Sequence, residues 1–175
     1  RMIAETMDRL LVEDIAPEEL LGDRVLDVVG SVAGHWQDSL RRFARVQARW
    51  LAELGAMGRV DAATRRNLLF AHAAKSWRAQ PPATPIVAAG VTSPAPALAR
   101  LLRVVSELPR GAVILPDLDL ALPDDAWDEL GRAGQSDDPN SETLGRNDAP
   151  THPQYHLKLL LGRMGVNRGE VQQWH

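Results

Sequence analysis

Cysteine is missing from this 175-residue sequence, and its absence excludes disulfide bonds, thiolate metal ligands and cysteine nucleophiles. Long apolar runs are missing as well: nowhere do about 18 apolar residues follow one another, the length that a membrane-spanning helix needs. The first residues also lack the apolar core of a signal peptide. We therefore expect a cytoplasmic protein that makes no contact with a membrane.

Two motifs that carry catalytic chemistry are also absent. The phosphate-binding loop G-x-x-x-x-G-K-[ST] does not occur, so we expect no nucleotide site within this chain. The nucleophile elbow G-x-S-x-G does not occur either. The sequence therefore predicts no catalytic residue, no bound cofactor and no metal site.

Three carboxylates keep an enzymatic alternative open. Asp117 and Asp119 directly follow an apolar run, as the magnesium-holding carboxylates of nucleotide-hydrolysing proteins do. With Asp124 they would suit a small metal-dependent hydrolase or phosphotransferase, whereas the missing phosphate loop favours solvated loop carboxylates. His152 and His156 lie four residues apart, as zinc ligands on a helix would, but the sequence offers no evident third ligand.

The sequence has the composition of a globular protein, with 45% hydrophobic and 25% charged residues, and its net charge of -3 is unevenly distributed. Residues 41–78 contain nine basic and only two acidic residues. This stretch is either an anion-facing surface or the solvated face of long helices. If it contacts DNA, Arg41 and Arg42 are candidate contacts. An acidic module that binds proteins and not DNA fits the net charge as well.

Residues 1–80 are expected to form a helical subdomain. Apolar spacing predicts a broken helical stretch over residues 2–34, a long amphipathic helix over 35–54 and a third helix from residue 62 to about 78, with Asp61 as its cap. The aromatic residues of the long helix, Trp36, Phe43 and Trp50, are expected to pack in the core, because base-stacking platforms need exposed aromatics.

Residues 81–130 are expected to contain a parallel β-α-β unit. The apolar runs at 86–89 and 112–115 predict two fully buried strands. A helix lies between them, with Pro94 in its first turn and Thr92 or Ser93 as its cap. Both hydroxyl residues are also candidate contacts for a DNA phosphate, since helix N-termini bind anions.

The remainder of the chain divides into two segments. Residues 131–150 are polar and rich in helix breakers, which predicts a mobile surface loop. Residues 151–175 are expected to form C-terminal helices, the first ending at Gly165 and the last capped by Asn167. The overall prediction is an α/β protein with a predominantly helical N-terminal part.

Several segments, in order along the chain, carry a resemblance to a known family. They are Trp36 with the helix that follows it, AATRRNLL (62–69), PIVAAGVT (85–92), LPRGAVILPDLD (108–119) and HPQY (152–155) with the residues up to Trp174. On these segments, which cover most of the chain, the sequence resembles the AddB subunits of bacterial AddAB helicase-nucleases, which act in double-strand break repair.

The resemblance implies an internal fragment of a longer subunit, from a P-loop helicase-like core with degenerate ATPase motifs. Active helicases of this kind end the first of these strands with an Asp-Glu pair, whereas this sequence has Ala88, Ala89 and Gly90 there. A Gln that senses phosphate is also missing after Asp119. The implied role is a noncatalytic scaffold and DNA-channel wall in recombinational repair of DNA breaks.

The same resemblance implies partners and cofactors for the parent complex. The partners would be an AddA-like motor subunit and DNA. The complex as a whole would be an ATP-dependent DNA helicase and exonuclease that uses ATP, magnesium and an iron-sulfur cluster, all of them outside this fragment.

Overall fold

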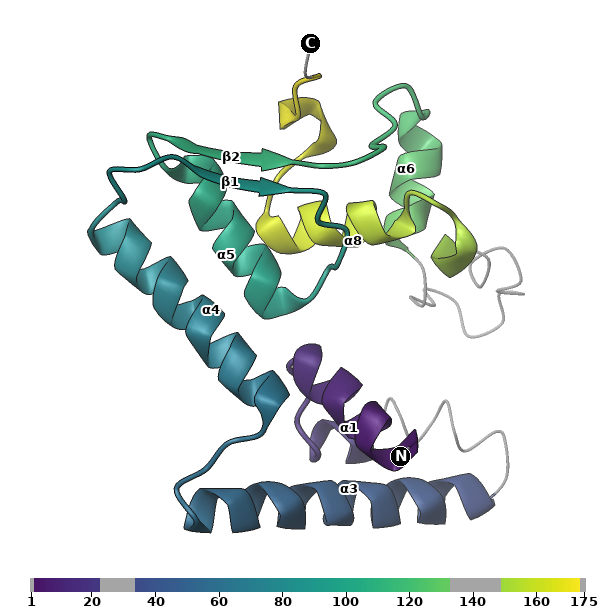
Figure 1. Cartoon of the computed structure of the whole chain (residues 1–175). Helices are drawn as coiled ribbons and strands as arrows, with labels where there is room; N and C mark the ends of the chain where they lie inside the picture. Colours follow the sequence, from purple (N-terminus) through teal and green to yellow (C-terminus); the bar gives the residue numbers. More distant parts are fainter. Residues whose placement is uncertain (1, 23–33, 133–148, 174–175) are drawn as a thin grey trace. The chain divides into compact units, whose positions relative to one another are not determined.

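The computed structural model describes residues 2–22, 34–132 and 149–173. The chain is mostly helical with one small parallel sheet, and it divides into two compact units, Arg1–Leu69 and Phe70–His175 (Figure 1). The division falls inside a helix. The mixed α/β class predicted from the sequence is therefore confirmed.

The first unit is built from helices. It contains α1 (Met2–Val12), the short 3-10 helix η1 (Glu19–Leu21), α3 (Gly34–Ala56) and the start of α4 (Ala62–Ala79). Asp61 caps α4 as predicted, because its Oδ1 accepts the backbone N–H of Thr64 at 2.9 Å. The second half of the broken helical stretch, residues 23–33, lies outside the described residues.

The buried side of α3 differs from the one predicted. Ala44, Gln47 and Leu54 are buried, whereas Trp36 is 62% exposed and Trp50 is 48% exposed. The prediction that both tryptophans pack in the core is wrong. The helix turns Ala44, Gln47 and Leu54 inward, whereas the large apolar residues Val46 and Trp50 are exposed on its flank.

The second unit is organised around the parallel strand pair β1 (Ile86–Ala89) and β2 (Gly111–Ile114). Ile86 pairs with Gly111, and Ala89 pairs with Ile114. Helix α5 (Pro96–Glu107) connects the strands, so the predicted β-α-β unit is confirmed. It is followed by α6 (Asp124–Gly131), the 3-10 helix η2 (Ala149–Thr151), α8 (Tyr155–Met164) and the 3-10 helix η3 (Arg168–Glu170).

One face of the sheet is packed and the other is not. Leu102 of α5 and Leu160 of α8 form a core cluster against Ala88 and Val113 of the strands. Both helices lie on the same side of the sheet, as Figure 1 shows. Val87, which points to the opposite side, is 57% exposed. The prediction of two fully buried strands is therefore wrong, since no described element covers the second face.

Local signals at the C-terminal end are confirmed. Gly165 caps α8 in the left-handed conformation, with φ of 67°. Asn167 caps the segment after it in a reciprocal capping box with Glu170, but that segment is only the 3-10 turn η3. The predicted mobile loop at 131–150 lies largely outside the described residues, as does Trp174.

Gly111 gives a direct test of the packing in the second unit. A Cβ atom at this position would lie 1.9 Å from the carbonyl oxygen of Val105 and 2.8 Å from the Cβ of Leu108. Gly111→Ala therefore has to displace β2 from the last turn of α5, and we expect it to lower the free energy of unfolding by about 1–3 kcal/mol.

The control for this experiment is Gly162→Ala in α8, where an added Cβ meets nothing within 4 Å. An alanine there favours the helix by roughly 0.5–1 kcal/mol. Urea unfolding of both variants, followed by circular dichroism, measures the difference. Equal stabilities for Gly111→Ala and the wild type would contradict the close packing of β2 on α5.

Candidate functional site

The outer surface of α3 carries a row of arginines. Arg42, Arg45 and Arg49 follow one another at spacings of three and four, which places them on one stripe of the helix. Arg41 pairs with Asp38 at 3.5 Å, and Arg49 pairs with Glu53 at 2.9 Å. These pairs are exposed and contribute little stability, so an incoming phosphate can replace the carboxylate.

Arg42 and Arg45 are the free cations of this surface. Both are exposed, and neither forms an ion pair with any of the residues that the structure describes. Val46 and the exposed ring of Trp50 lie beside them, and Trp36 is exposed near the start of the same helix. Surfaces that bind single-stranded nucleic acid typically combine cations with exposed aromatic rings, because the cations contact phosphates and the rings stack on bases.

The four predicted nucleic-acid contacts fall in different units. Arg41 and Arg42 lie on α3 of the first unit, whereas Thr92 and Ser93 lie between β1 and α5 of the second unit. The structure thus brings Arg41 and Arg42 together on one helix. It places Thr92 and Ser93 together on one exposed loop.

Thr92 and Ser93 do not cap α5 as predicted. The helix begins two residues later than expected, with Ala95 as the N-cap residue, Pro96 at the first helical position and no side-chain cap. Ser93 Oγ lies 3.5 Å from the backbone nitrogen of Ala95, which is long for a hydrogen bond. A proline fixes the first turn of α5, so the start of this helix does not depend on a hydroxyl cap.

Asp117 and Asp119 form part of a turn after β2. Asp119 Oδ1 accepts the backbone N–H groups of Ala121 and Leu122, at 2.8 and 3.1 Å. Asp117 adopts the left-handed conformation, with φ of 53°. The Asp119 carboxylate therefore stabilises its own loop, as aspartates in turns commonly do.

A buried glutamine that sequence reasoning missed fixes this turn. Gln154, 9% exposed, donates from Nε2 to the carbonyl oxygen of Asp117 at 2.8 Å and accepts at Oε1 from the backbone N–H of Asp119 at 3.0 Å. The two contacts join residues that are 35 and 37 positions apart in the sequence, so no local sequence pattern predicts them. They hold the loop at the end of β2 against the start of α8.

The metal-site candidates are not assembled into a ligand cluster. Within the described ranges, no group of three or more histidine, aspartate, glutamate or cysteine residues is arranged to hold a metal ion. His152 precedes α8, and its Nδ1 accepts the backbone N–H of Gln154 at 3.2 Å, whereas His156 lies inside the helix. The two histidines therefore do not share a face of one helix.

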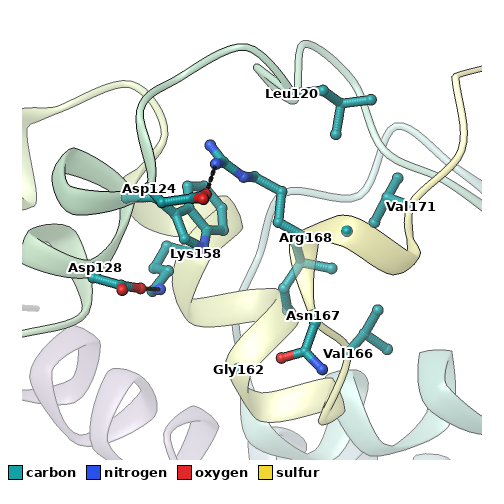
Figure 2. A pocket seen from close by; sticks show the side chains of 12 residues that line it. Leu120, Asp124, Asp128, Lys158, Gly162, Val166, Asn167, Arg168 and Val171 are labelled. Atoms are coloured by element: carbon teal, nitrogen blue, oxygen red, sulfur yellow. Dashed lines mark hydrogen bonds and ion pairs between the residues drawn. The ribbon is translucent and has the colours of Figure 1, made fainter.

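A hollow of about 540 Å³ in the second unit is bordered by charged side chains around a tryptophan (Figure 2). The Nζ of Lys158 lies 4.8 Å from the ring centre of Trp127, and the guanidinium carbon of Arg168 lies 5.0 Å from it. Lys158 pairs with Asp128 at 3.2 Å, and Arg168 pairs with Asp124. We call Trp127, Lys158 and Arg168 the tryptophan clasp.

The tryptophan clasp has a structural role in this geometry. Trp127 is 7% exposed, and it belongs to a core cluster with Leu130, Ala149 and Leu161. Because both cations of the clasp already have carboxylate partners, the hollow offers no uncompensated charge to a ligand. The clasp joins α6 to α8 and η3, which follow it more than twenty residues later in the sequence.

Comparison with known proteins adds no identification. No family model matches the chain, no curated protein matches it, and no solved structure matches it. Among the described residues, no helix is both long and apolar enough to cross a membrane.

Two buried glutamines provide a matched test of hydrogen bonding. Gln154→Met leaves the carbonyl of Asp117 and the N–H of Asp119 without their partner. We expect this substitution to lower the free energy of unfolding by about 1–3 kcal/mol. Gln47 is 0% exposed, and neither its Oε1 nor its Nε2 has a hydrogen-bond partner among the described residues. We therefore expect Gln47→Met to raise the free energy of unfolding by about 1–3 kcal/mol.

Native-state hydrogen exchange is the measurement best suited to these two variants, because it gives the protection of backbone amides separately for the unit that contains each glutamine. Amides of α8 should lose protection in Gln154→Met, and amides of α3 should gain protection in Gln47→Met. A change of the same sign in both variants would contradict the difference in hydrogen bonding between the two side chains.

Two tryptophans provide a matched test of the clasp. Trp127→Ala removes a buried ring together with both cation contacts, and we expect it to lower the free energy of unfolding by about 3–5 kcal/mol. Trp36→Ala removes an exposed ring and is expected to change stability by at most about 0.5 kcal/mol. Chemical unfolding measures both, and similar losses would show that Trp127 does not anchor the second unit.

Proposed function

We propose that the chain is a noncatalytic part of a helicase-nuclease subunit of the AddB kind, acting as scaffold and DNA-channel wall in the repair of double-strand breaks. The observation that supports this proposal most is the exposed surface of α3, where the free cations Arg42 and Arg45 alternate with apolar and aromatic side chains. Such a surface suits the backbone and bases of single-stranded DNA.

The ends of the two strands support the noncatalytic part of the proposal. In parallel α/β sheets, ligands bind at the carboxyl ends of the strands. Here β1 ends in Ala88 and Ala89, followed by Gly90, and none of these residues has a side chain that holds magnesium or orients water. After β2, the Asp119 carboxylate is engaged by two backbone amides, which does not favour the hydrolase alternative.

In the proposed assembly, ATP hydrolysis belongs to an AddA-like motor subunit. The magnesium and iron-sulfur sites of the complex belong to parts of it outside this chain. The contribution of this chain is to contact the DNA backbone through Arg41, Arg42 and Arg45 on α3. The exposed loop at Thr92 and Ser93 provides a second, polar contact to phosphate.

The proposal predicts salt-dependent binding of single-stranded DNA. Each phosphate contact on a single strand contributes about 0.7 to the slope of log K against log salt concentration. Arg42→Gln combined with Arg45→Gln should therefore reduce the magnitude of that slope by about 1.4 and weaken binding at low salt. Fluorescence anisotropy of a labelled oligonucleotide, measured between about 50 and 200 mM salt, gives both quantities.

The matched control is Arg9→Gln combined with Arg132→Gln, which removes the same charge from exposed positions on α1 and directly after α6. This control should keep the wild-type slope. Binding that does not depend on salt, or an equal loss in the control, would refute a DNA contact through α3.

A further inference from the structure

An apolar groove in the first unit lies between α1 and α3. Its walls carry Ile3, Met7 and Leu11 from α1 and Val46 and Trp50 from α3, and the start of α4 borders it. The groove has a volume of about 570 Å³. We call it the α1–α3 groove.

Three of the five large apolar side chains of this groove are exposed, while Met7 and Leu11 are half-buried. Ile3 is 59% exposed, Val46 is 56% exposed and Trp50 is 48% exposed, and α1 contributes no buried residue at all. Contiguous exposed apolar surface of this kind marks a place where another molecule binds, because it is unfavourable in water.

The charged residues on the groove walls are both acidic. Asp8 is exposed and forms no ion pair with any described residue. Asp61 uses Oδ1 to cap α4, while its Oδ2 is buried and has no hydrogen-bond partner in the part of the chain that the structure describes. No cation among the described residues pairs with either carboxylate, so the groove presents uncompensated negative charge beside apolar surface.

We propose that the α1–α3 groove binds a basic amphipathic helix of a protein partner. Aliphatic side chains of that helix, at spacings of three and four, would enter the groove between α1 and α3 as one helix packs on two others. A lysine or arginine of the partner would lie against Asp8 and Asp61, and the exposed face of Trp50 also attracts a cation.

This assignment is separate from the proposed DNA contact. The two carboxylates repel phosphate, so the groove is unsuited to nucleic acid, whereas Arg42 and Arg45 are suited to it. The helix α3 therefore carries an arginine stripe and, beside it, an apolar flank with Val46 and Trp50 that both proposals use. Arg42 and Arg45 belong to the DNA contact alone, and Asp8 and Asp61 belong to the groove alone, so substitutions at these four residues separate the two functions.

The test uses the full chain and two synthetic amphipathic helical peptides with identical leucines. One peptide carries lysine on its polar face and the other carries glutamate at the same positions. We expect the lysine peptide to bind about tenfold more tightly than the glutamate peptide in fluorescence anisotropy. Equal binding of the two peptides, or no binding of either, would overturn the proposal.

Variants locate the binding. Asp8→Asn combined with Asp61→Asn should remove the preference for lysine, while the asparagine at 61 still accepts the N–H of Thr64 and preserves the cap. Trp50→Ala should weaken binding of the lysine peptide about tenfold or more, whereas Trp36→Ala on the same helix should leave this binding unchanged. Unchanged binding in Trp50→Ala would place the peptide elsewhere and overturn the proposal.

Two further measurements distinguish the occupants and the two functions. Sedimentation at increasing protein concentration detects a second copy in the groove, and self-association that Trp50→Ala abolishes would overturn the assignment to a partner helix. The variant with Arg42→Gln and Arg45→Gln should bind the lysine peptide like the wild type. If the wild-type chain showed no salt-dependent DNA binding, the proposed function would fail, whereas intact binding of the lysine peptide would leave this inference standing.

Discussion

The packing of two helices on one face of a two-stranded parallel sheet is the constraint on which the second unit depends. Leu102 of α5 and Leu160 of α8 meet over Ala88 and Val113, and the missing side chain of Gly111 lets β2 approach the last turn of α5. Two parallel strands cannot bury enough surface alone, so α5 and α8 supply most of the stability.

The loops at the strand ends take their positions from this packing. Because α8 lies on the sheet, Gln154 at its start reaches the turn after β2 and hydrogen-bonds both Asp117 and Asp119. The tryptophan clasp then fixes α6 and η3 to the same helix. The opposite face of the sheet, with Val87, is left open by the described residues.

Local sequence patterns predicted the positions of strands and helix caps well, but they predicted the burial and the distant contacts of side chains poorly. Apolar runs located β1 and β2 to within a residue, and glycine and asparagine located the caps at Gly165 and Asn167. The exposure of Trp50 and Val87 was not predictable, because it depends on which elements pack nearby. Gln154 was missed for the same reason, since its partners lie far away in the sequence.

The sequence predicted Arg41 and Arg42 as contacts, and the structure places them on an exposed helix surface that also includes Arg45 and Trp50. This arrangement has a simple physical reason. The buried residues of α3 are Ala44, Gln47 and Leu54, whereas Val46, Trp50 and the arginines of the helix are exposed and available to other molecules.

The most direct test of this account is an amide NMR titration of the isotope-labelled chain with a single-stranded oligonucleotide. The account predicts shifts along α3 around Arg42, Arg45 and Trp50 at about 50 mM salt that shrink strongly at about 200 mM. Shifts that cluster instead at the turn of Asp117 and Asp119, or that ignore the salt concentration, would contradict it.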